Sequence, residues 1–275
     1  MRPALALHPG PQPSLPFAPS TASPTGKPRP CARYASRDPR PYGRPLLLPP
    51  VLGPPGGAAL EPQATGRPDG GAFPEAQSPS RLVPALNRRA LCVAGDLRQE
   101  EAVETLRREA LEAFGTVDIV VNNAGVGKYG PLLDFTLEDY DWIMDTNMRT
   151  SFLVTRALLP TLLQKGAGDL VFVASAAGLK GLPHEAVYCA SKFAQVGFAQ
   201  ALHHELREKG IRVCVVAPGG VHTEFAFGTG RTPEDSRLKA FLRPEEVAEA
   251  VVFALSQPPH ARVFLVGMRP MVEPL

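Results

Sequence analysis

Beyond about Leu91 the sequence alternates between short, continuously apolar runs and longer amphipathic stretches. The apolar runs span residues 90–96, 117–121, 169–175, 211–218 and 261–267, and the amphipathic stretches span residues 99–114, 137–166, 185–210 and 243–257. Apolar spacing predicts strands for the first set and helices for the second. Strands that are apolar throughout are buried on both faces, and their alternation with helices is typical of a parallel sheet. The sequence therefore predicts an α/β fold, a doubly wound parallel sheet with helices on both faces.

Single residues refine the expected helices. Pro160, near the end of the 137–166 helix, predicts a kink, because proline removes a backbone donor. Gly210 is expected to close the 185–210 helix as its C-cap. Asn147 lies in mid-helix, where its intrinsic propensity is unfavourable, and this position indicates a specific hydrogen-bonding task. The alternative is a side chain that only faces solvent.

Residues 1–85 have a different composition, since 20 of the 31 prolines lie within residues 1–80. Each proline fixes φ and removes a hydrogen-bond donor, so no periodic stretch here is long enough for a helix or strand. We expect residues 1–85 to be a Pro/Arg/Gly-rich segment, disordered or aberrant, and residues 86–275 to form the folded domain. One hypothesis is a frame-shifted or mis-spliced segment, which the other reading frames of the coding DNA would test.

Charge and hydropathy exclude several classes of partner. The formal net charge is only +2, and the arginines of the first segment are scattered among prolines without interleaved aromatic residues, so no nucleic-acid partner is expected. No apolar run approaches the roughly 18 residues of a membrane helix. The start of the chain is too interrupted by proline for a signal peptide, and the same prolines argue against an organelle transit peptide.

The four cysteines, Cys31, Cys92, Cys189 and Cys214, have no C-x-x-C spacing. Three of them lie in apolar runs, which favours reduced core thiols over a disulfide or a metal site. We therefore expect a cytoplasmic protein without a metal.

A polar group follows the predicted strands at one edge of the sheet. Tyr188 and Lys192 form Y-x-x-x-K on a predicted helix, and their spacing of four puts both side chains on one face. Ser175 ends the 169–175 strand, where an open parallel sheet presents its ligand crevice. Taken alone, the pair is a common helical spacing and the serine a strand-end hydroxyl.

Two further motifs end neighbouring strands. Asn122-Asn123-Ala124-Gly125 follows the 117–121 strand, and its small residues let a ligand approach the backbone. The segment from Pro218 to Thr223 follows the 211–218 strand. Each motif alone could be a simple turn or loop, but with Asn147, Ser175 and the Tyr-Lys pair they share one sheet edge.

In this order the motifs resemble those of the classical short-chain dehydrogenase/reductase family. The resemblance rests on N-N-A-G at residues 122–125, the helix asparagine at Asn147, the serine at Ser175, Y-x-x-x-K at Tyr188 and Lys192, and P-G-x-V-x-T at residues 218–223. It extends from about Leu91 to the C-terminus. It implies a Rossmann-type sheet, here incomplete in its N-terminal half, and makes residues 86–275 the catalytic domain.

The resemblance also implies hydride transfer between NAD or NADP and a small-molecule carbonyl or alcohol. Tyr188 would be the general acid or base, and because a free phenol has a pKa of about 10, the Lys192 ammonium would favour its phenolate. Ser175 would bind the substrate oxygen, and Asn147 would fix a water that links Lys192 to solvent. Residues expected to bind the cofactor are Asp96, Leu97, Asn123, Ala124, Gly125, Tyr188, Lys192, Pro218, Gly219, Val221 and Thr223, with Asp96 holding the adenine.

The glycine-rich phosphate loop of the family is not recognisable here. Residues 53–59, Gly-Pro-Pro-Gly-Gly-Ala-Ala, give only a degenerate version, and Pro49, Pro50 and Pro62 interrupt the strand and helix that should flank it. The second strand, which normally distinguishes NAD from NADP, is also missing. The segment from Phe225 to Leu242 should cover the substrate.

Three interpretations remain open. The leading one is an NAD(P)-dependent carbonyl/alcohol oxidoreductase, homo-oligomeric if its fold is complete. The second is a truncated, catalytically inert paralogue or isoform that cannot bind dinucleotide, and the third is a Pro-rich interaction module with an enzyme domain attached. Titration with NADH and NADPH, followed by Trp142 fluorescence, separates the first two.

Overall fold

The computed structural model describes residues 90–273. The predictions made for residues 1–85, including the degenerate glycine loop at 53–59, lie outside the described residues.

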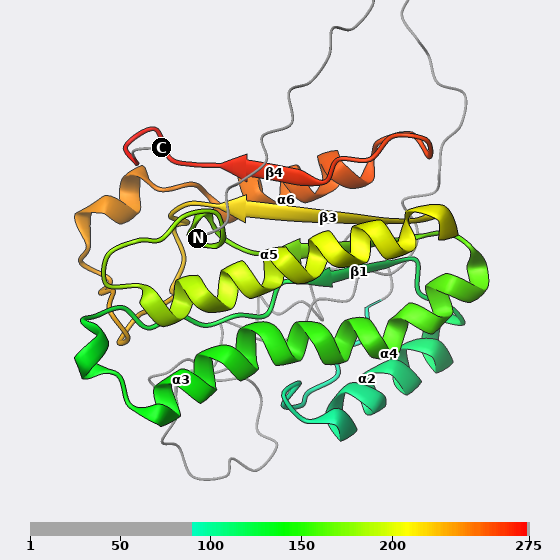
Figure 1. Cartoon of the computed structure of the whole chain (residues 1–275), viewed down its shortest axis with the longest axis horizontal. Helices are drawn as coiled ribbons and strands as arrows, with labels where there is room; N and C mark the ends of the chain where they lie inside the picture. Colours follow the sequence, from blue (N-terminus) through cyan, green and yellow to red (C-terminus); the bar gives the residue numbers. More distant parts are fainter. Residues whose placement is uncertain (1–89, 274–275) are drawn as a thin grey trace, which may run out of the picture. The chain divides into compact units, whose positions relative to one another are not determined.

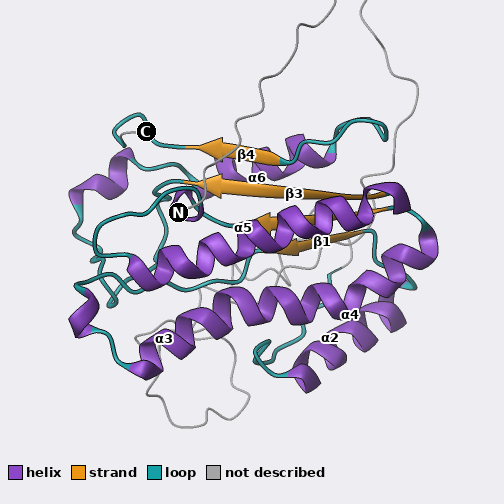
Figure 2. Ribbon diagram, viewed as in Figure 1, coloured by secondary structure: helices purple, strands orange, loops and turns teal. Residues whose placement is uncertain are grey.

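The core of the described fold is a four-stranded parallel sheet (Figure 2). Its strands are β1 (Ile119–Asn122), β2 (Gly168–Val173), β3 (Ile211–Pro218) and β4 (Leu265–Met268), in the spatial order β1-β2-β3-β4. All three neighbouring pairs are parallel. This arrangement confirms the predicted parallel sheet.

Alternate side chains of the strands pack on opposite faces of the sheet. Val120, Leu170 and Val213 lie side by side across β1, β2 and β3 and join one hydrophobic cluster. Val171 and Cys214 point to the other face and join a second cluster. Both faces are therefore apolar, which explains why these strands read as continuous apolar runs.

Helices cover both faces of this sheet (Figure 1). The larger helices are α2 (Glu100–Phe114), α3 (Leu137–Met144), α4 (Thr150–Lys165), α5 (Ala186–Leu206) and α6 (Pro244–Leu255). Helices α2, α4 and α5 supply the cluster on one face, and α6 supplies the cluster on the other. None of the helices within residues 90–273 has the length and apolar character to cross a membrane. The doubly wound arrangement is thus confirmed.

The expected single helix over residues 137–166 is divided. A π-helical turn, η3 (Asp145–Arg149), joins α3 to α4, whereas Pro160 lies inside α4. A π-helical turn widens the helix locally and is frequent at functional sites. The irregularity that matters for the site therefore lies at Asn147, within this turn.

The expected strand at Ala90–Asp96 is wrong, because these residues form no strand. A strand exists only through hydrogen bonds to a neighbour, and within the described residues β1 pairs with β2 alone. An apolar run without a paired neighbour stays irregular, whatever its composition.

Short turns complete the fold, namely the 3-10 helices η2 (Leu132–Asp134), η4 (Ala176–Gly178), η5 (Arg207–Lys209) and η6 (Ser236–Ala240). Gly210 follows η5 with a φ of 74°, in the left-handed region that the predicted C-cap requires. A Cβ at Gly210 would overlap the carbonyl oxygen of Gly166, so no larger residue fits here.

Candidate active site

The carboxyl ends of β1, β2 and β3 lie at the same edge of the sheet, because the strands are parallel. The N-N-A-G motif begins at the last residue of β1, at this edge, and Ser175 is the second residue after β2 rather than the end of the strand itself. Gly125 lies against both Asn147 and Lys192, since a Cβ there would sit 3.2 Å from Asn147 Oδ1 and 3.3 Å from Lys192 Nζ. The structure therefore joins these predicted residues in one cluster.

Ser175 is fixed at the start of η4 and interacts with Tyr188. Its Oγ accepts a hydrogen bond from Ala177 N at 3.1 Å. Burial raises the pKa of the Tyr188 phenol, and a side-chain hydrogen bond with Ser175 acts in the opposite direction and lowers it. Tyr188 is only 6% exposed. A hydroxyl group thus lies beside the phenol in a site with little water.

Lys192 lies one turn after Tyr188 on the buried face of α5, as predicted. Its Nζ is 5.8 Å from the centroid of the Tyr188 ring and donates to Gln195 Oε1 at 2.8 Å and to Val173 O at 3.3 Å. Burial lowers the pKa of the Lys192 amine to about 7. The amine can therefore gain or lose a proton near neutral pH.

Asn147 has the hydrogen-bonding task that its unfavourable position indicated. It is fully buried, its Oδ1 accepts from Val126 N at 2.8 Å, and its Nδ2 donates to Val126 O at 3.0 Å. The same Nδ2 donates to Ser191 Oγ at 2.8 Å, and Ser191 donates to Tyr188 O at 2.7 Å. Asn147 thereby ties the loop after β1 to the helix that carries Tyr188.

Gln195 is part of the site, and reasoning from the sequence missed it. It is fully buried, and its Nε2 donates to Asn147 O at 2.9 Å and to Ser151 Oγ at 2.7 Å, while its Oε1 accepts from Lys192. The available signal was its position three residues after Lys192, on the same face of the helix. Ser151, four residues after Asn147, follows the same rule.

The loop after β3 closes the site on its other side. Ser175 Oγ lies 3.5 Å from Pro218 O, and Gly219 N donates to Met268 O at 2.8 Å. Gly220 N donates to the carboxylate of Glu273 at 2.8 Å, and this close approach is possible only because Gly220 has no Cβ. The loop is therefore fixed to β4 and to the C-terminal segment.

Farther along the same loop, a second pair of backbone bonds holds the chain. His222 N donates to Leu242 O at 2.8 Å, and Leu242 N donates to Gly220 O at 3.0 Å. Val221 forms an isolated parallel bridge with Leu242, and Thr223 N donates to Val221 O. The predicted residues Val221 and Thr223 thus lie on a loop whose backbone is well fixed.

Two aromatic side chains cover the Tyr188 ring. The Tyr129 ring meets it edge-on with centroids 5.6 Å apart, and the Phe225 ring lies 5.8 Å away in a tilted arrangement. Phe225 belongs to the 225–242 segment that was expected to cover the substrate. This segment is also tied to the loop after β1, because Tyr129 N donates to Thr229 O at 2.8 Å.

Comparison with known proteins agrees with this geometry. A family model described as short chain dehydrogenase matches residues 75–233. The chain is 34% identical over 178 residues to sepiapterin reductase of Chlorobaculum tepidum, an alignment that covers 65% of this chain and 71% of that protein. The chain belongs to the short-chain dehydrogenase family. The resemblance seen in the sequence is therefore confirmed, and with it membership of an oxidoreductase family.

Solved structures of this family share the fold. Alcohol dehydrogenase from Thermococcus sibiricus, complexed with 5-hydroxy-NADP, aligns with a TM-score of 0.59 and 28% identity, covering 66% of this chain and 74% of that one. A metagenomic short-chain oxidoreductase in complex with NADP aligns with a TM-score of 0.59 and 28% identity, covering 70% and 80%. The Rossmann-type architecture expected for this short-chain dehydrogenase is thereby shown.

Four other predicted cofactor residues of this short-chain dehydrogenase differ in their exposure and contacts. The Asp96 carboxylate forms a two-pronged ion pair with Arg98, with contacts of 2.8 to 3.0 Å, and this hydrogen bonding lowers its pKa. The Leu97 side chain is buried in the hydrophobic core, so only its backbone could face a ligand. Asn123 is exposed and Ala124 is buried. The binding roles of these residues remain predictions.

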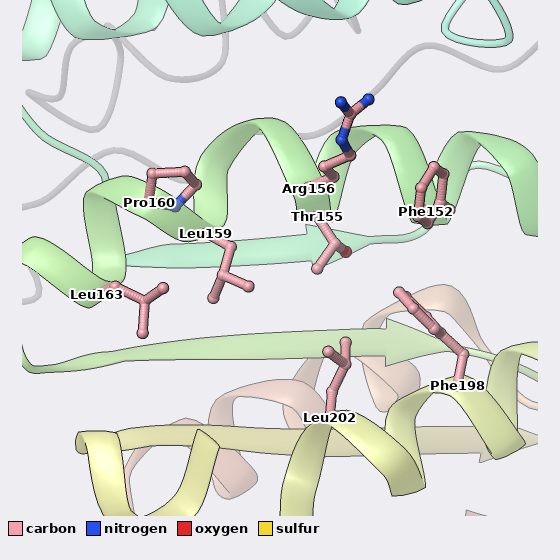
Figure 3. A pocket seen from close by; sticks show the side chains of 8 residues that line it. All are labelled: Phe152, Thr155, Arg156, Leu159, Pro160, Leu163, Phe198 and Leu202. Atoms are coloured by element: carbon pink, nitrogen blue, oxygen red, sulfur yellow. The ribbon is translucent and has the colours of Figure 1, made fainter. Parts of the chain in front are cut away.

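A separate apolar depression of about 250 Å³ lies between α4 and α5 (Figure 3). It is lined by Phe152, Thr155, Arg156, Leu159, Pro160, Leu163, Phe198 and Leu202. None of these residues belongs to the catalytic cluster of this short-chain dehydrogenase. The depression is therefore distinct from the site around Tyr188.

Proposed function

We propose that this chain interconverts a small-molecule carbonyl and an alcohol with NAD or NADP, and that Tyr188 transfers the proton. The observation that carries the proposal is the position of the Ser175 hydroxyl beside the buried Tyr188 phenol, whose ring centroid lies 5.8 Å from Lys192 Nζ. A hydroxyl pair at the carboxyl edge of a parallel sheet is a suitable binding point for a substrate oxygen. The NADP complexes of two family members support the choice of cofactor.

The described residues fit the nicotinamide end of such a cofactor. Gly125 brings the backbone close to Asn147 Oδ1 and Lys192 Nζ, whereas the space beside Gly219 and Gly220 is occupied by the Glu273 carboxylate. Lys192 would hold the ribose hydroxyls, and the 218–223 loop would hold the nicotinamide. When bound, the nicotinamide supplies or accepts the hydride, and the positive charge of its oxidised form favours the Tyr188 phenolate.

In the reduction direction, Tyr188 donates its phenolic proton to the carbonyl oxygen, and Ser175 donates a hydrogen bond to the same oxygen. In the oxidation direction the phenolate accepts the alcohol proton. The Lys192 amine stabilises the phenolate when the amine is protonated. Because the pKa of this amine is about 7, the amine can take up or release its own proton near neutral pH. Asn147 positions α5 through Ser191, and the water relay that the family resemblance implies for it stays a prediction.

The test is Tyr188→Phe, measured as NADPH-dependent reduction of a panel of small ketones and aldehydes. General acid catalysis contributes about 10²- to 10⁴-fold, so turnover should fall by at least that factor. NADPH affinity, followed by Trp142 fluorescence, should stay within error, because only one hydroxyl is removed. Tyr140→Phe, at a half-exposed position on α3, is the matched control. Residual turnover near the control level would remove Tyr188 from the proton transfer.

The NADPH titration followed by Trp142 fluorescence also tests the alternative that the chain is catalytically inert. Trp142 is buried and packs with Val126 and Val187, which adjoin Asn147 and Tyr188, so it should report on binding at the site. A fluorescence change with NADPH or NADH supports the enzyme. Silence with both cofactors contradicts the proposed function and favours a chain that does not bind dinucleotide.

We include a homo-oligomer in the proposal, as expected from the sequence, because α4 and α5 expose apolar side chains. Phe152 on α4 and Phe193 on α5 are 42% and 45% exposed, and Phe152 also lines the depression in Figure 3. A second copy of the chain would bury these apolar groups. Light scattering after size exclusion should give at least a dimer, and Phe152→Glu should shift it towards the monomer.

A further inference from the structure

Arg231 lies in the segment that covers the Tyr188 ring, and its guanidinium is held near two aromatic rings. Its Cζ is 5.4 Å from the centroid of the Tyr129 ring and 5.3 Å from that of the Phe241 ring. Such cation–π contacts orient a guanidinium through its flat face and leave the N–H groups along its edge for another partner. Within residues 90–273, no carboxylate lies at ion-pair distance from Arg231.

The backbone of Arg231 is fixed relative to the catalytic tyrosine. Its N donates to Ala226 O at 2.9 Å, and its O accepts from Gly228 N at 3.1 Å, which closes a tight turn. Tyr129, whose ring contacts Arg231, also contacts the Tyr188 ring. The guanidinium is thus one aromatic ring away from the group that is proposed to transfer the proton.

The charge of Arg231 acts on the site. The positive charge of Arg231 lowers the pKa of Tyr188, Tyr129 and Glu185. In each case burial raises the pKa by more than this charge lowers it. Burial nevertheless leaves the pKa of the Glu185 carboxyl above its ordinary value, which favours its neutral form.

Asp235, which lies near Arg231, and Glu273, which lies near Glu185, are engaged elsewhere. Asp235 forms a two-pronged ion pair with Arg237, with contacts of 2.7 to 3.2 Å. Glu273 accepts the hydrogen bond from Gly220 N. A cation is therefore available beside the catalytic cluster, and the surrounding carboxylates do not pair with it at close range.

We propose that Arg231 binds a carboxylate of the substrate, so that the carbonyl compounds this enzyme reduces are oxo acids and the alcohols it oxidises are hydroxy acids. The inference deepens the proposed function and rests on it. Arginine matches a carboxylate with two parallel hydrogen bonds, and a bound anion would complete the pairing of Arg231 that the described residues leave open. A neutral carbonyl compound offers no such partner.

The test compares acids with their own methyl esters. Pyruvate, levulinate and 5-oxohexanoate, each beside its ester, are assayed for reduction by NADPH with the wild type, Arg231→Met and Arg231→Lys. A charge-assisted bidentate contact corresponds to about 10- to 100-fold in kcat/KM, so the wild type should prefer at least one acid over its ester by that factor. Arg231→Met should remove this preference by lowering kcat/KM for the acid while leaving kcat/KM for the ester unchanged. Arg231→Lys should keep part of the preference. Lys239→Met removes an exposed positive charge from the same segment and is the matched control.

Binding of the same pairs, measured by calorimetry with NADP⁺ present, keeps the test independent of turnover. Acid binding that is tighter than ester binding and depends on Arg231 supports the proposal, even if the wild type reduces none of the compounds and the proposed catalytic function fails. Equal losses for acid and ester in Arg231→Met would overturn the proposal, because they indicate a structural role in the covering segment. A wild type without any acid preference overturns it too, and so does a variant that loses only NADPH affinity, which would assign Arg231 to a cofactor phosphate.

Discussion

Lys192 Nζ donates to Gln195 Oε1 at 2.8 Å, and the same glutamine donates to the backbone carbonyl of Asn147 at 2.9 Å. The glutamine therefore connects the lysine on α5 to the π-helical turn that holds Asn147. Both groups are buried, so each depends on Gln195 for hydrogen bonds that water cannot replace. The position of the lysine amine is thus set by a residue outside the recognised motifs.

This relationship predicts that Gln195→Leu destabilises the protein and disturbs Lys192. Leaving buried polar groups without partners costs about 1–3 kcal/mol, which denaturant unfolding should detect. Gln195→Glu should instead raise the pKa of Lys192, because a carboxylate would lie beside the amine, and the pH dependence of turnover should follow. If Gln195→Leu unfolds at the wild-type midpoint, the network does not stabilise the fold.

Ser175→Ala should reduce turnover without unfolding the protein. The change removes a donor to the substrate oxygen, which by analogy with an oxyanion donor is worth about 10²- to 10³-fold in kcat. It also removes the hydrogen bond that lowers the Tyr188 pKa, so the pH at which the tyrosine ionises in the rate profile should rise. Ser256→Ala, at the end of α6, is the control, and a rate loss equal in both variants would contradict the assignment.

Lys192 should make the stability of the cofactor-free protein depend on pH. Its pKa in the folded state is about 7, below the ordinary value of 10.5, so between these two values the unfolded chain binds more protons than the folded one. Stability contributed at this position therefore rises with pH over that window, and it is lowest below pH 7, where a charged amine is buried.

The effect of Lys192→Met on the stability of the cofactor-free protein, relative to wild type, should accordingly become less favourable as pH rises from about 7 towards 10. Thermal unfolding of wild type and variant at several pH values measures the difference. A difference between wild type and variant that stays constant with pH would show that the amine titrates normally in the folded state.

Arg212 should be the most important charged residue for the stability of the sheet. Its guanidinium pairs with Asp169 through contacts of 2.6 and 3.0 Å and donates to the carbonyls of Leu255 and Gln257 at the end of α6. Removing one partner of a largely buried pair costs about 3–5 kcal/mol, so Arg212→Met should lower the free energy of unfolding by about 3 kcal/mol.

The matched control is Arg156→Met, because the pair of Arg156 with Glu100 is 62% and 69% exposed on its two sides. An exposed pair is worth less than about 1 kcal/mol. Similar losses in both variants would indicate that burial does not decide the strength of the Arg212 pair.

Local sequence rules were sufficient where the relevant neighbours are close in the chain. The spacing of Tyr188 and Lys192 placed both on one helical face, and apolar runs between helices gave the parallel sheet, whose geometry brings Ser175 and Pro218 to one edge. The odd position of Asn147 correctly indicated a buried hydrogen-bonding task. These features follow from backbone periodicity, which three or four residues are enough to reveal.

Tertiary structure decided what depends on contacts between distant segments. It showed that Gln195 completes the Lys192 network, that Asn147 bonds to Val126 and Ser191, and that residues 90–96 form no strand. A strand requires a paired neighbour, and a buried amide is satisfied by whichever groups the fold brings within 3 Å, about the length of one hydrogen bond. The sequence alone determined which chemical groups stand at the sheet edge, whereas only the packing of α5 against the η3 turn determined how they are held.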